Sequence, residues 1–454
     1  MRNLSLQNIV AAVRGDYHGD IKALSKKISA VTTDSRRITN GCLFAAIKGE
    51  NADGHDYIGS AFKKGALCAF AESSPGSVAG NVIIVKDTVK ALGDLAMFYR
   101  AQFDIPIIGI SGSVGKTSAK EMLFSVLSQR FVVHKTEGNL NNELGVPLTL
   151  FGIDEKTEVA VIEMGISHFG EMARLAEIVR PNIAMYTVIG SAHLEYLGDL
   201  EGVLKAKGEM LPYLQYDGIV FINGDDKYLN KIRCKLKITK YGLNNNCDLR
   251  AENIRPLGTE GMELIIKSDT RSIYAKINSF GSHLVSVALA AAAVGIELGL
   301  SDVEISKGIA AYTPVGSRAG IIKAGKITII DDCYNANPTS TAAALSSLAM
   351  LSGRRVAILG DMMELGENTE SLHHDIGVIA AEKGIELVLA CGDLSVNTTK
   401  AAADRGTKAI HFKSKEALIT ALPELIKEGD FVLVKASNSK KFGDIVSALK
   451  KQLI

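Results

Sequence analysis

Several residue types that support particular functions are scarce in this chain of 454 residues. Tryptophan is absent, and aromatic residues make up only 6% of the sequence. Lysine and arginine number 51 against 50 aspartates and glutamates, so the formal net charge is +1. Such a chain offers neither a strong positive field for a polyanion nor many aromatic rings for base stacking. We therefore expect no nucleic-acid partner.

The sequence also has few features of secreted or membrane proteins. Its six cysteines (42, 68, 234, 247, 333 and 391) form no CxxC pair, which predicts reduced thiols rather than a disulfide framework or a cysteine zinc site. The N-terminus lacks a long apolar stretch, and the apolar run at 284–296 is too short and serine-interrupted to span a bilayer. We expect a cytoplasmic protein without membrane insertion, and a monomer.

The chain is too long for one ordinary hydrophobic core, and at about 100 to 200 residues per domain it predicts about three domains. From residue 105 an apolar strand, IPIIGI, leads into a glycine-rich turn and then into helically spaced apolar residues at 119–127. Further strand candidates at 159–162, 183–189 and 219–222 alternate with helical stretches. This pattern predicts a mostly parallel sheet covered by helices.

The same alternation restarts after residue 316 and predicts a separate doubly wound, Rossmann-like domain. Its strand candidates are 327–331, 355–359, 386–390 and 431–435. The first hundred residues hold shorter strand candidates and one helix, at 42–47, 66–71, 81–85 and 88–102. We expect an α/β protein with a small N-terminal α/β domain (1–103), a central P-loop domain (104–313) and a C-terminal domain (314–454).

The glycine-rich turn at 109–117, GISGSVGKT, lies between a strand and a helix, where backbone N–H groups and the helix dipole can hold phosphate oxygens. Lys116 would reach the β- and γ-phosphates of a nucleotide, and the Thr117 hydroxyl would bind Mg²⁺. The strict P-loop pattern has glycine at 110, where this chain has isoleucine, so the loop is a variant. The alternative is a turn that only caps a helix. A P-loop alone does not separate an ATPase, a kinase, a GTPase and a ligase.

Three further segments place polar side chains near this loop. Glu163 ends the apolar strand VAVIE, so its carboxylate is expected at the C-terminal edge of the sheet beside Thr117, where it could hold Mg²⁺. His193 follows a later strand candidate and reaches the same edge. Lys205 and Lys207 lie in a helical stretch, EGVLKAKGEML. On spacing alone each has an ordinary explanation, because strand-end carboxylates are often turn residues, a lone histidine is often structural, and helical lysines are usually exposed.

Five ordered segments of the central region together resemble the Mur ligases: GISGSVGKTS (109–118), TEGNLNNELGVP (136–147), AVIEMG (160–165), AHLEYLG (192–198) and KAKGEM (205–210). Other segments resemble the branch of that family that adds D-alanyl-D-alanine. They are TTDSR (32–36), GCLFAAIKG (41–49), DGH (53–55), PVGSR (314–318), DDCYNANP (331–338), LGDMMELGE (359–367) with His373, and VLVKAS (432–437). The resemblance covers nearly the whole chain.

The resemblance implies an ATP- and Mg²⁺-dependent ligase of peptidoglycan synthesis. Its substrates would be ATP, D-alanyl-D-alanine and a UDP-N-acetylmuramoyl-tripeptide. The terminal carboxylate of the tripeptide would be activated as an acyl phosphate before the dipeptide amine attacks it. Lys207 matches a lysine that many members of the family carbamylate, which would turn a cation into a metal-binding anion.

The resemblance also implies roles for single residues. The implied ATP-binding residues are Gly112, Ser113, Val114, Gly115, Lys116, Thr117, Ser118, Arg318, Asp332, Tyr334 and Asn335. The implied metal ligands are Thr117, Glu163, His193 and carbamylated Lys207, and the implied catalytic residues are Lys116, Glu163, His193 and Lys207. The implied substrate-binding residues are Thr33, Asp34, Ser35, Arg36, Lys48, Asp53, His55, Asn139, Asn141, Asn142, Lys435 and Ser437.

Two segments depart from the family's pattern. After His283, where the family has two asparagines that help to hold adenine, this chain has Leu284 and Val287. Where the family has Gly-Ser-Arg after VLVK, Ala436 and Asn438 replace the glycine and the arginine. Two alternatives stay open. One is a related ligase of the folylpolyglutamate or cyanophycin type, which should lack TTDSR and DDCYNANP together. The other is a regulatory paralogue that binds nucleotide without completing ligation.

Overall fold

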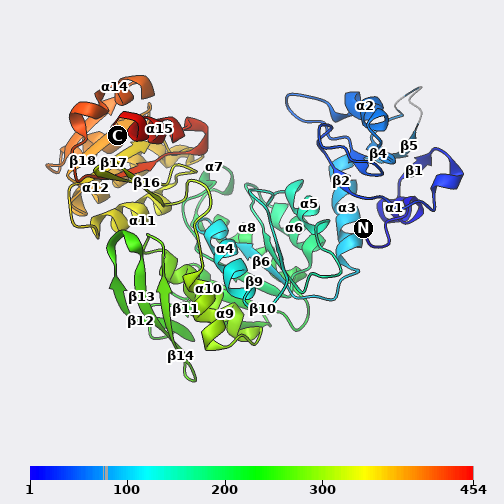
Figure 1. Ribbon diagram of the computed structural model, residues 1–454, viewed down its shortest axis with the longest axis horizontal. Coiled ribbons are helices and arrows are strands. Elements are labelled where there is room, and N and C mark those ends of the chain that lie inside the picture. Colours follow the sequence, from blue (N-terminus) through cyan, green and yellow to red (C-terminus); the bar gives the residue numbers. More distant parts are fainter. Residues whose placement is uncertain (75, 77–79, 453–454) are drawn as a thin grey trace.

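The computed structural model describes residues 1–74, 76 and 80–452, which form three α/β lobes, each built on its own sheet. In Figure 1 the N-terminal lobe (residues 6–100) lies at one end of the molecule and the C-terminal lobe (residues 320–452) at the other. The central lobe (residues 107–310) lies between them. The expected α/β fold class is confirmed.

The N-terminal lobe has a five-stranded sheet of order β1-β5-β4-β3-β2, in which only β1 runs antiparallel to its neighbour. Helix α3 begins after Asp87, whose side chain accepts a hydrogen bond from the amide of Lys90. The strands are β1 (Asp16–His18), β2 (Val31–Thr32), β3 (Leu43–Ala45), β4 (Cys68–Ala71) and β5 (Asn81–Ile84), and the helices are α1 (Leu6–Val13), α2 (Ile58–Lys63) and α3 (Thr88–Arg100).

The junction between the N-terminal and central lobes is packed and hydrogen-bonded. Arg100, at the end of α3, has a buried guanidinium that donates to three main-chain carbonyl oxygens, the shortest bond reaching Val179 at 2.7 Å. One apolar cluster continues across the junction, from Ile9 of α1 through Leu92 of α3 to Leu175 of α6 in the central lobe. The two lobes therefore share a hydrophobic cluster, in addition to the separate cluster that each of them has on the other face of its sheet.

The central lobe has a nine-stranded sheet of order β14-β13-β12-β11-β10-β9-β6-β8-β7. The strands from β7 to β12 are parallel, and β12, β13 and β14 form an antiparallel extension that was not expected. These strands alternate buried and accessible residues, so their sequences lack the continuous apolar runs of a doubly covered sheet. The strands are β6 (Ile107–Ser111), β7 (Val133–Lys135), β8 (Val159–Glu163), β9 (Ile183–Tyr186), β10 (Ile219–Asn223), β11 (Lys237–Gly242), β12 (Leu249–Pro256), β13 (Met262–Lys267) and β14 (Ser272–Ile277).

Helices cover both faces of the parallel part of this sheet. Residues of α4, α9 and α10 pack with Ile108 and Ile110 of β6 on one face, and residues of α5, α6 and α8 pack with Ile107 and Ile162 on the other. The apolar run at 284–296 forms the buried helix α9, and no helix among the described residues is long and apolar enough to cross a membrane. The helices are α4 (Lys116–Leu127), α5 (Gly145–Leu150), α6 (Glu171–Val179), α7 (Leu194–Leu197), α8 (Leu200–Gly208), α9 (Leu284–Glu297) and α10 (Asp302–Ala310).

The C-terminal lobe has a six-stranded sheet of order β15-β16-β20-β17-β18-β19, parallel except for the antiparallel edge strand β15. Helices α11, α12 and α13 cover one face, and α14 and α15 cover the other, as a doubly wound fold requires. The strands are β15 (Gly320–Ala324), β16 (Ile327–Asp331), β17 (Arg355–Gly360), β18 (Leu387–Cys391), β19 (Lys408–Phe412) and β20 (Phe431–Lys435), and the helices are α11 (Pro338–Ala349), α12 (Thr369–Glu382), α13 (Val396–Ala403), α14 (Lys415–Leu425) and α15 (Gly443–Gln452).

Candidate active site

A cavity of about 780 Å³ lies where the three lobes meet, and each lobe contributes to its wall. The N-terminal lobe supplies residues 47–49, the central lobe supplies the glycine-rich turn, and the C-terminal lobe supplies the segment after β16. The predicted site residues that line this cavity are Lys48, Ser113, Val114, Gly115, Lys116, Thr117, Ser118, Asn139, Asn141, Asn142, Glu163, His193, Arg318, Asp332, Tyr334, Asn335 and Lys435.

The glycine-rich turn joins β6 to α4 at the cavity wall. Gly112 and Gly115 have φ values of +148° and +82°, in the left-handed region that favours glycine. A Cβ atom at Gly112 would lie 2.0 Å from the Oγ1 atom of Thr187, so the turn needs glycine there. Ile110, which departs from the strict motif, is a buried strand residue. The variant residue therefore belongs to the sheet, and the turn itself keeps the geometry that exposes backbone amides at the start of α4.

Glu163 lies at the end of β8, as expected, and contacts the first turn of α4. Its carboxylate accepts from the Thr117 hydroxyl, which lies 3.0 Å from Oε2 and 3.2 Å from Oε1, and from the amide group of Asn141 at 2.8 Å. Glu163 is only 2% exposed. The predicted pair of Thr117 and Glu163 is thus brought together beside Lys116, whose ammonium group donates to the carbonyl oxygen of Gly112 at 2.8 Å.

The Thr117–Glu163 pair fits a magnesium ion that is shared with nucleotide phosphates. Mg²⁺ in such sites usually binds one or two protein oxygens and completes its shell with phosphates and water. Among the described residues no group of three or more His, Cys, Asp and Glu side chains is arranged to hold a metal ion by itself. One hydroxyl and one carboxylate are a donor set that fits an ion whose remaining ligands are phosphates and water.

A buried lysine that the sequence did not indicate lies below this pair. Lys120, one helical turn after Lys116, is fully buried, and its ammonium group lies 3.7 Å from Oε2 of Glu163 and 3.3 Å from Oε1 of Glu121. It also donates to the carbonyl oxygen of Gly138 at 3.3 Å. A lysine in this helix would ordinarily be expected on the solvent side. Its position next to the phosphate turn is the one signal that could have singled it out.

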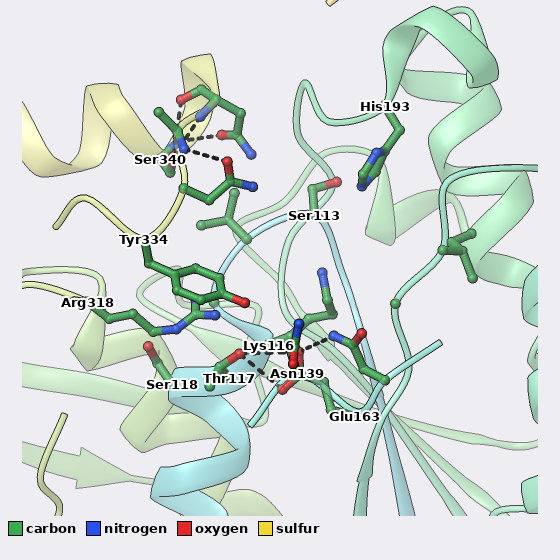
Figure 2. A pocket seen from close by; sticks show the side chains of 18 of the residues that line it. Ser113, Lys116, Thr117, Ser118, Asn139, Glu163, His193, Arg318, Tyr334 and Ser340 are labelled. Carbon is green, nitrogen blue, oxygen red and sulfur yellow. Dashed lines mark hydrogen bonds between the residues drawn. The ribbon is translucent and has the colours of Figure 1, made fainter. Parts of the chain in front are cut away.

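His193 precedes α7 with a φ of +56°, and its ring lines the cavity (Figure 2). Its Nδ1 atom lies 2.6 Å from Oε2 of Glu364, a residue of the C-terminal lobe. Burial lowers the pKa of His193, the positive charges of Lys207 and Lys116 lower it further, and the carboxylate of Glu364 opposes them. The strand before it ends at Tyr186 rather than at residue 189, so His193 lies on the connection to α7.

Lys207 is 1% exposed, so the expectation of an ordinary exposed lysine is wrong for this residue, whereas Lys205 is exposed. Burial lowers the pKa of Lys207 well below that of a free lysine, and the nearby charge of Lys116 lowers it further. Lys207 does not line the cavity. It lies behind the wall, within electrostatic range of both Lys116 and His193.

The C-terminal lobe presents a stacked pair to the glycine-rich turn. The guanidinium carbon of Arg318 lies 3.9 Å from the centre of the Tyr334 ring, and Figure 2 shows the two side chains opposite Lys116 and Thr117. Asp332, two residues before Tyr334, accepts from the buried ammonium group of Lys435 at 2.6 Å. The remaining wall beside the stacked pair is largely apolar and includes Phe280, Ile330, Ala343, Ala344 and Leu433.

The residues at the departures from the family pattern have structural partners. Leu284 and Val287 are buried in α9, in the core of the central lobe. Asn438 donates through its side-chain amide to the carbonyl oxygen of Tyr334 at 3.0 Å, so it anchors the segment that carries the stacked ring. Ser437 is buried, accepts from the amide of Met363 at 3.0 Å, and does not line the cavity.

Most predicted residues of the N-terminal lobe lie outside the cavity wall. Arg36 forms an ion pair with Asp34 at 2.8 Å, and hydrogen bonds from Arg36 lower the pKa of Asp34 to about 2. His55 lies 2.6 Å from Asp53 in a second pair. These pairs lie on loops of one lobe and leave Lys48 as its predicted residue at the cavity. The predicted site residues outside the wall are Thr33, Asp34, Ser35, Arg36, Asp53, His55, Gly112, Lys207 and Ser437.

Three family models together match most of the chain. Residues 27–100 match the Mur ligase family, catalytic domain; residues 110–295 match the Mur ligase middle domain; and residues 317–438 match the Mur ligase, glutamate ligase domain. Similar proteins include UDP-N-acetylmuramoyl-tripeptide--D-alanyl-D-alanine ligases of Escherichia coli, at 38% identity over 96% of both chains, and of Bacillus subtilis, at 35% over 98% of both chains.

Solved structures agree with these sequence matches. The chain is similar to MurF from Acinetobacter baumannii, with a TM-score of 0.91 and 30% identity over 99% of both chains. It is also similar to MurF ligase from Thermotoga maritima in complex with ADP, with a TM-score of 0.85 and 25% identity over 93% of this chain and 97% of that one. Folylpolyglutamate synthase from Mycobacterium tuberculosis is 14% identical with a TM-score of 0.64, a likeness in fold alone.

Proposed function

The chain belongs to the Mur ligase family, and from this premise we infer that it joins D-alanyl-D-alanine to UDP-N-acetylmuramoyl-tripeptide with the conversion of ATP to ADP and phosphate. The observation that carries this assignment is the cavity at the meeting point of the three lobes. It combines a phosphate-binding turn and a buried carboxylate from the central lobe with polar side chains from both other lobes, such as Lys48 and Arg318. Three substrates that must react together need such a shared chamber.

The proposed reaction uses the geometry around Lys116. A carboxylate is a poor electrophile, so the terminal carboxylate of the tripeptide attacks the γ-phosphate of ATP and forms an acyl phosphate while ADP leaves. Lys116 and the amides at the start of α4 neutralise the charge that gathers on the phosphate oxygens. The free amine of D-alanyl-D-alanine then attacks the acyl carbon, and inorganic phosphate leaves as the amide forms. A chamber walled by three lobes limits hydrolysis of the acyl phosphate.

We propose Mg²⁺ as the metal cofactor. Thr117 and Glu163 are the residues that would hold it, with His193, which also lines the cavity, as a further ligand. The ion would supply charge neutralisation on the transferring phosphate. Glu163 accepts hydrogen bonds from Thr117 and Asn141, so the carboxylate is held in place with an oxygen facing the cavity.

We propose that Lys207 is carbamylated. Carbamylation needs an uncharged amine that attacks CO₂, and burial together with the charge of Lys116 favours the uncharged form. The resulting carbamate would be an anion close to the cation Lys116, whose positive charge it would compensate. The burial of Lys207 and its low pKa support this proposal independently of the family resemblance.

The three lobes are proposed to divide the substrates. Lys48, with the predicted loop residues of the N-terminal lobe, would hold the UDP-sugar, and the loop that carries Asn139, Asn141 and Asn142 would hold the tripeptide near the phosphate. The Arg318–Tyr334 pair, Asp332 and Asn335 would contact the nucleotide, and Lys435 would contact the dipeptide. Because one chain supplies all these walls, we propose a monomer, and its soluble nucleotide substrates favour a cytoplasmic location.

The assignment can be tested by reconstitution. Phosphate release and the mass of the product are measured with ATP, Mg²⁺, D-alanyl-D-alanine and UDP-N-acetylmuramoyl-tripeptide, and each component is omitted in turn. We expect the pentapeptide product only with the complete set, and no product from the Lys116→Met variant. If ATP binds but neither a lysine- nor a diaminopimelate-containing tripeptide is extended, the regulatory paralogue becomes the better assignment.

A further inference from the structure

A loop of the C-terminal lobe reaches across to the metal-binding wall of the central lobe. It follows β17 and carries Glu364, whose Oε2 atom lies 2.6 Å from Nδ1 of His193. The main chains of the two lobes are also in contact, since the amide of Glu195 donates to the carbonyl oxygen of Glu364 at 3.4 Å. Gly366 of the same loop lies directly against the main chain of Glu195. The contact is therefore a docked loop rather than a chance approach of two side chains.

The loop holds Glu364 in an unusual backbone conformation. Its φ is +62°, a left-handed value that a residue with a Cβ atom rarely adopts. Such strain persists where the surrounding structure fixes it, and it concentrates at functional sites. Two buried anchors fix this loop, because His373 accepts from the amide of Met362 at 3.0 Å and Ser437 accepts from the amide of Met363 at 3.0 Å. The strained residue is the one that faces His193.

The position of this carboxylate favours one of the two ring nitrogens of His193 as the one that carries the proton. A neutral imidazole carries one proton, and a carboxylate at Nδ1 favours the form with the proton on that nitrogen. The unprotonated Nε2 is then the nitrogen that can bind a metal ion or accept a hydrogen bond in the cavity. Histidine ligands in metal sites commonly have a carboxylate beside their second ring nitrogen, and its negative charge favours one tautomer and one ring orientation.

We propose that Glu364 is a positioning residue of the metal site, which it completes from another lobe. By holding His193 in the Nδ1–H form, Glu364 makes the binding of the divalent cation in the central lobe depend on the docking of the C-terminal lobe. The dependence is reciprocal, because a cation that binds better to the docked arrangement also stabilises it. This inference rests on the proposed metal role of His193, but it does not require that ligation occurs.

Cation binding to the full-length protein tests this inference without any turnover. Mn²⁺ serves as the probe, and its free concentration is measured by electron paramagnetic resonance in the presence of ADP. We expect Glu364→Ala to weaken Mn²⁺ binding by about tenfold, the effect typical for loss of a partner that orients a ligand. Mn²⁺ binding by Glu364→Gln should be intermediate between that of the wild type and that of Glu364→Ala, because the side-chain amide keeps an oxygen near Nδ1 but carries no negative charge. Glu367→Ala changes an exposed carboxylate of the same loop and should bind as the wild type does.

A double-mutant cycle separates positioning from a general structural role. In the His193→Ala background, Glu364→Ala should have no further effect on Mn²⁺ binding, because the residue through which it acts is gone. An equal loss in both backgrounds would overturn the inference, as would unchanged binding in the single variant. Tighter Mn²⁺ binding by Glu364→Ala would also overturn it, since the carboxylate would then be blocking the imidazole.

A second measurement reports the coupling between lobes. Small-angle scattering with ADP and Mn²⁺ should show a compact wild type, with the C-terminal lobe docked as in the structure, and a less compact Glu364→Ala variant. If the variant is as compact as the wild type, the docking of the lobe does not depend on this contact. If Glu364→Ala weakens Mn²⁺ binding as expected but the reconstituted ligation assay gives no product, the inference about Glu364 stands and only the proposed reaction is wrong.

Discussion

The ammonium group of Lys120 lies 3.7 Å from a carboxylate oxygen of Glu163, and both side chains are almost completely buried. The same lysine donates to the carbonyl oxygen of Gly138, at the start of the loop that carries Asn139 and Asn141. One buried cation thus holds the proposed magnesium carboxylate and the asparagine loop at fixed positions. It also lies 3.3 Å from Glu121, so the cation is itself paired.

Replacing Lys120 by methionine should therefore affect both stability and turnover. The variant removes the lysine beside the buried carboxylate of Glu163, whereas Glu121 keeps its ion pair with Lys135. Breaking a buried ion pair typically costs about 3–5 kcal/mol in the free energy of unfolding. A shift of the reacting groups by about 1 Å can cost about 100-fold in rate. Urea unfolding and steady-state kinetics would measure the two effects. Lys307→Met changes an exposed lysine of α10 and should alter neither the free energy of unfolding nor the rate. A fully active Lys120→Met enzyme would contradict the positioning role.

The stacked pair of Arg318 and Tyr334 should contribute to nucleotide affinity. We expect Tyr334→Ala to weaken ADP binding by about fivefold, because it removes the ring that holds the Arg318 guanidinium at the cavity wall and such a half-buried contact is worth about 1 kcal/mol. Tyr334→Phe keeps the ring and should bind nearly as the wild type does. Isothermal titration with ADP measures the affinity. Equal ADP binding by Tyr334→Ala would mean that the pair contacts another substrate.

Gly112 should tolerate no side chain. A Cβ atom there would lie 2.0 Å from Oγ1 of Thr187, so Gly112→Ala must displace the turn whose amides face the phosphates. A hydrogen bond to a charged group is worth about 1.5–3 kcal/mol, and the loss of one would weaken ADP binding by about 10- to 100-fold. Gly443→Ala is a suitable control because a Cβ atom at Gly443 has no neighbour within 4 Å. Normal ADP affinity in Gly112→Ala would show that the turn does not hold the phosphates.

His373 should make the C-terminal lobe sensitive to mild acid. Burial lowers the pKa of His373, and its Nε2 accepts from the amide of Met362, which requires that nitrogen to be unprotonated. The unfolded chain, with an ordinary histidine pKa of about 6.5, therefore takes up the proton more readily than the folded one. The contribution of His373 to stability is complete above that value and is lost as the pH falls through the lowered pKa.

This pH dependence can be measured by urea unfolding. The free energy of unfolding should fall between about pH 7.5 and about pH 5 in the wild type, and His373→Gln should remove part of that fall. His374→Gln changes the neighbouring, half-exposed histidine and should leave the slope as it is. An unchanged slope in His373→Gln would mean that other groups cause the acid sensitivity.

The sequence was sufficient for the parts of the site whose signals are local. The strand, the glycine-rich turn and the helix that carries Thr117 are adjacent in the chain, and Glu163 ends the next apolar strand of the same parallel sheet. The two residues were therefore predicted to meet at the carboxyl edge of that sheet, as they do. The buried apolar strands of the three sheets were found for the same reason. The antiparallel strands β12 to β14 were not, because their accessible face interrupts each apolar run with polar residues.

The remaining site residues depend on contacts between distant segments. Lys120 and Lys207 lie in helices where spacing alone predicts solvent exposure, and only the packing of neighbouring elements buries them. Glu364 meets His193 because two lobes dock, and no local pattern indicates which carboxylate of its loop faces the imidazole. The substrate residues of the N-terminal lobe, such as Arg36 and His55, remain predictions, since their loops lie outside the shared cavity wall.

The hydrophobic cluster that spans the first two lobes determines how the protein unfolds on heating. Because the cluster that contains Ile9, Leu92 and Leu175 belongs to both lobes, neither can melt without exposing apolar surface of the other. The clusters around the C-terminal sheet are separate from it. A calorimeter should therefore record two cooperative transitions for three sheets, and bound Mg²⁺ and ADP, which touch both units, should bring the two transitions closer together.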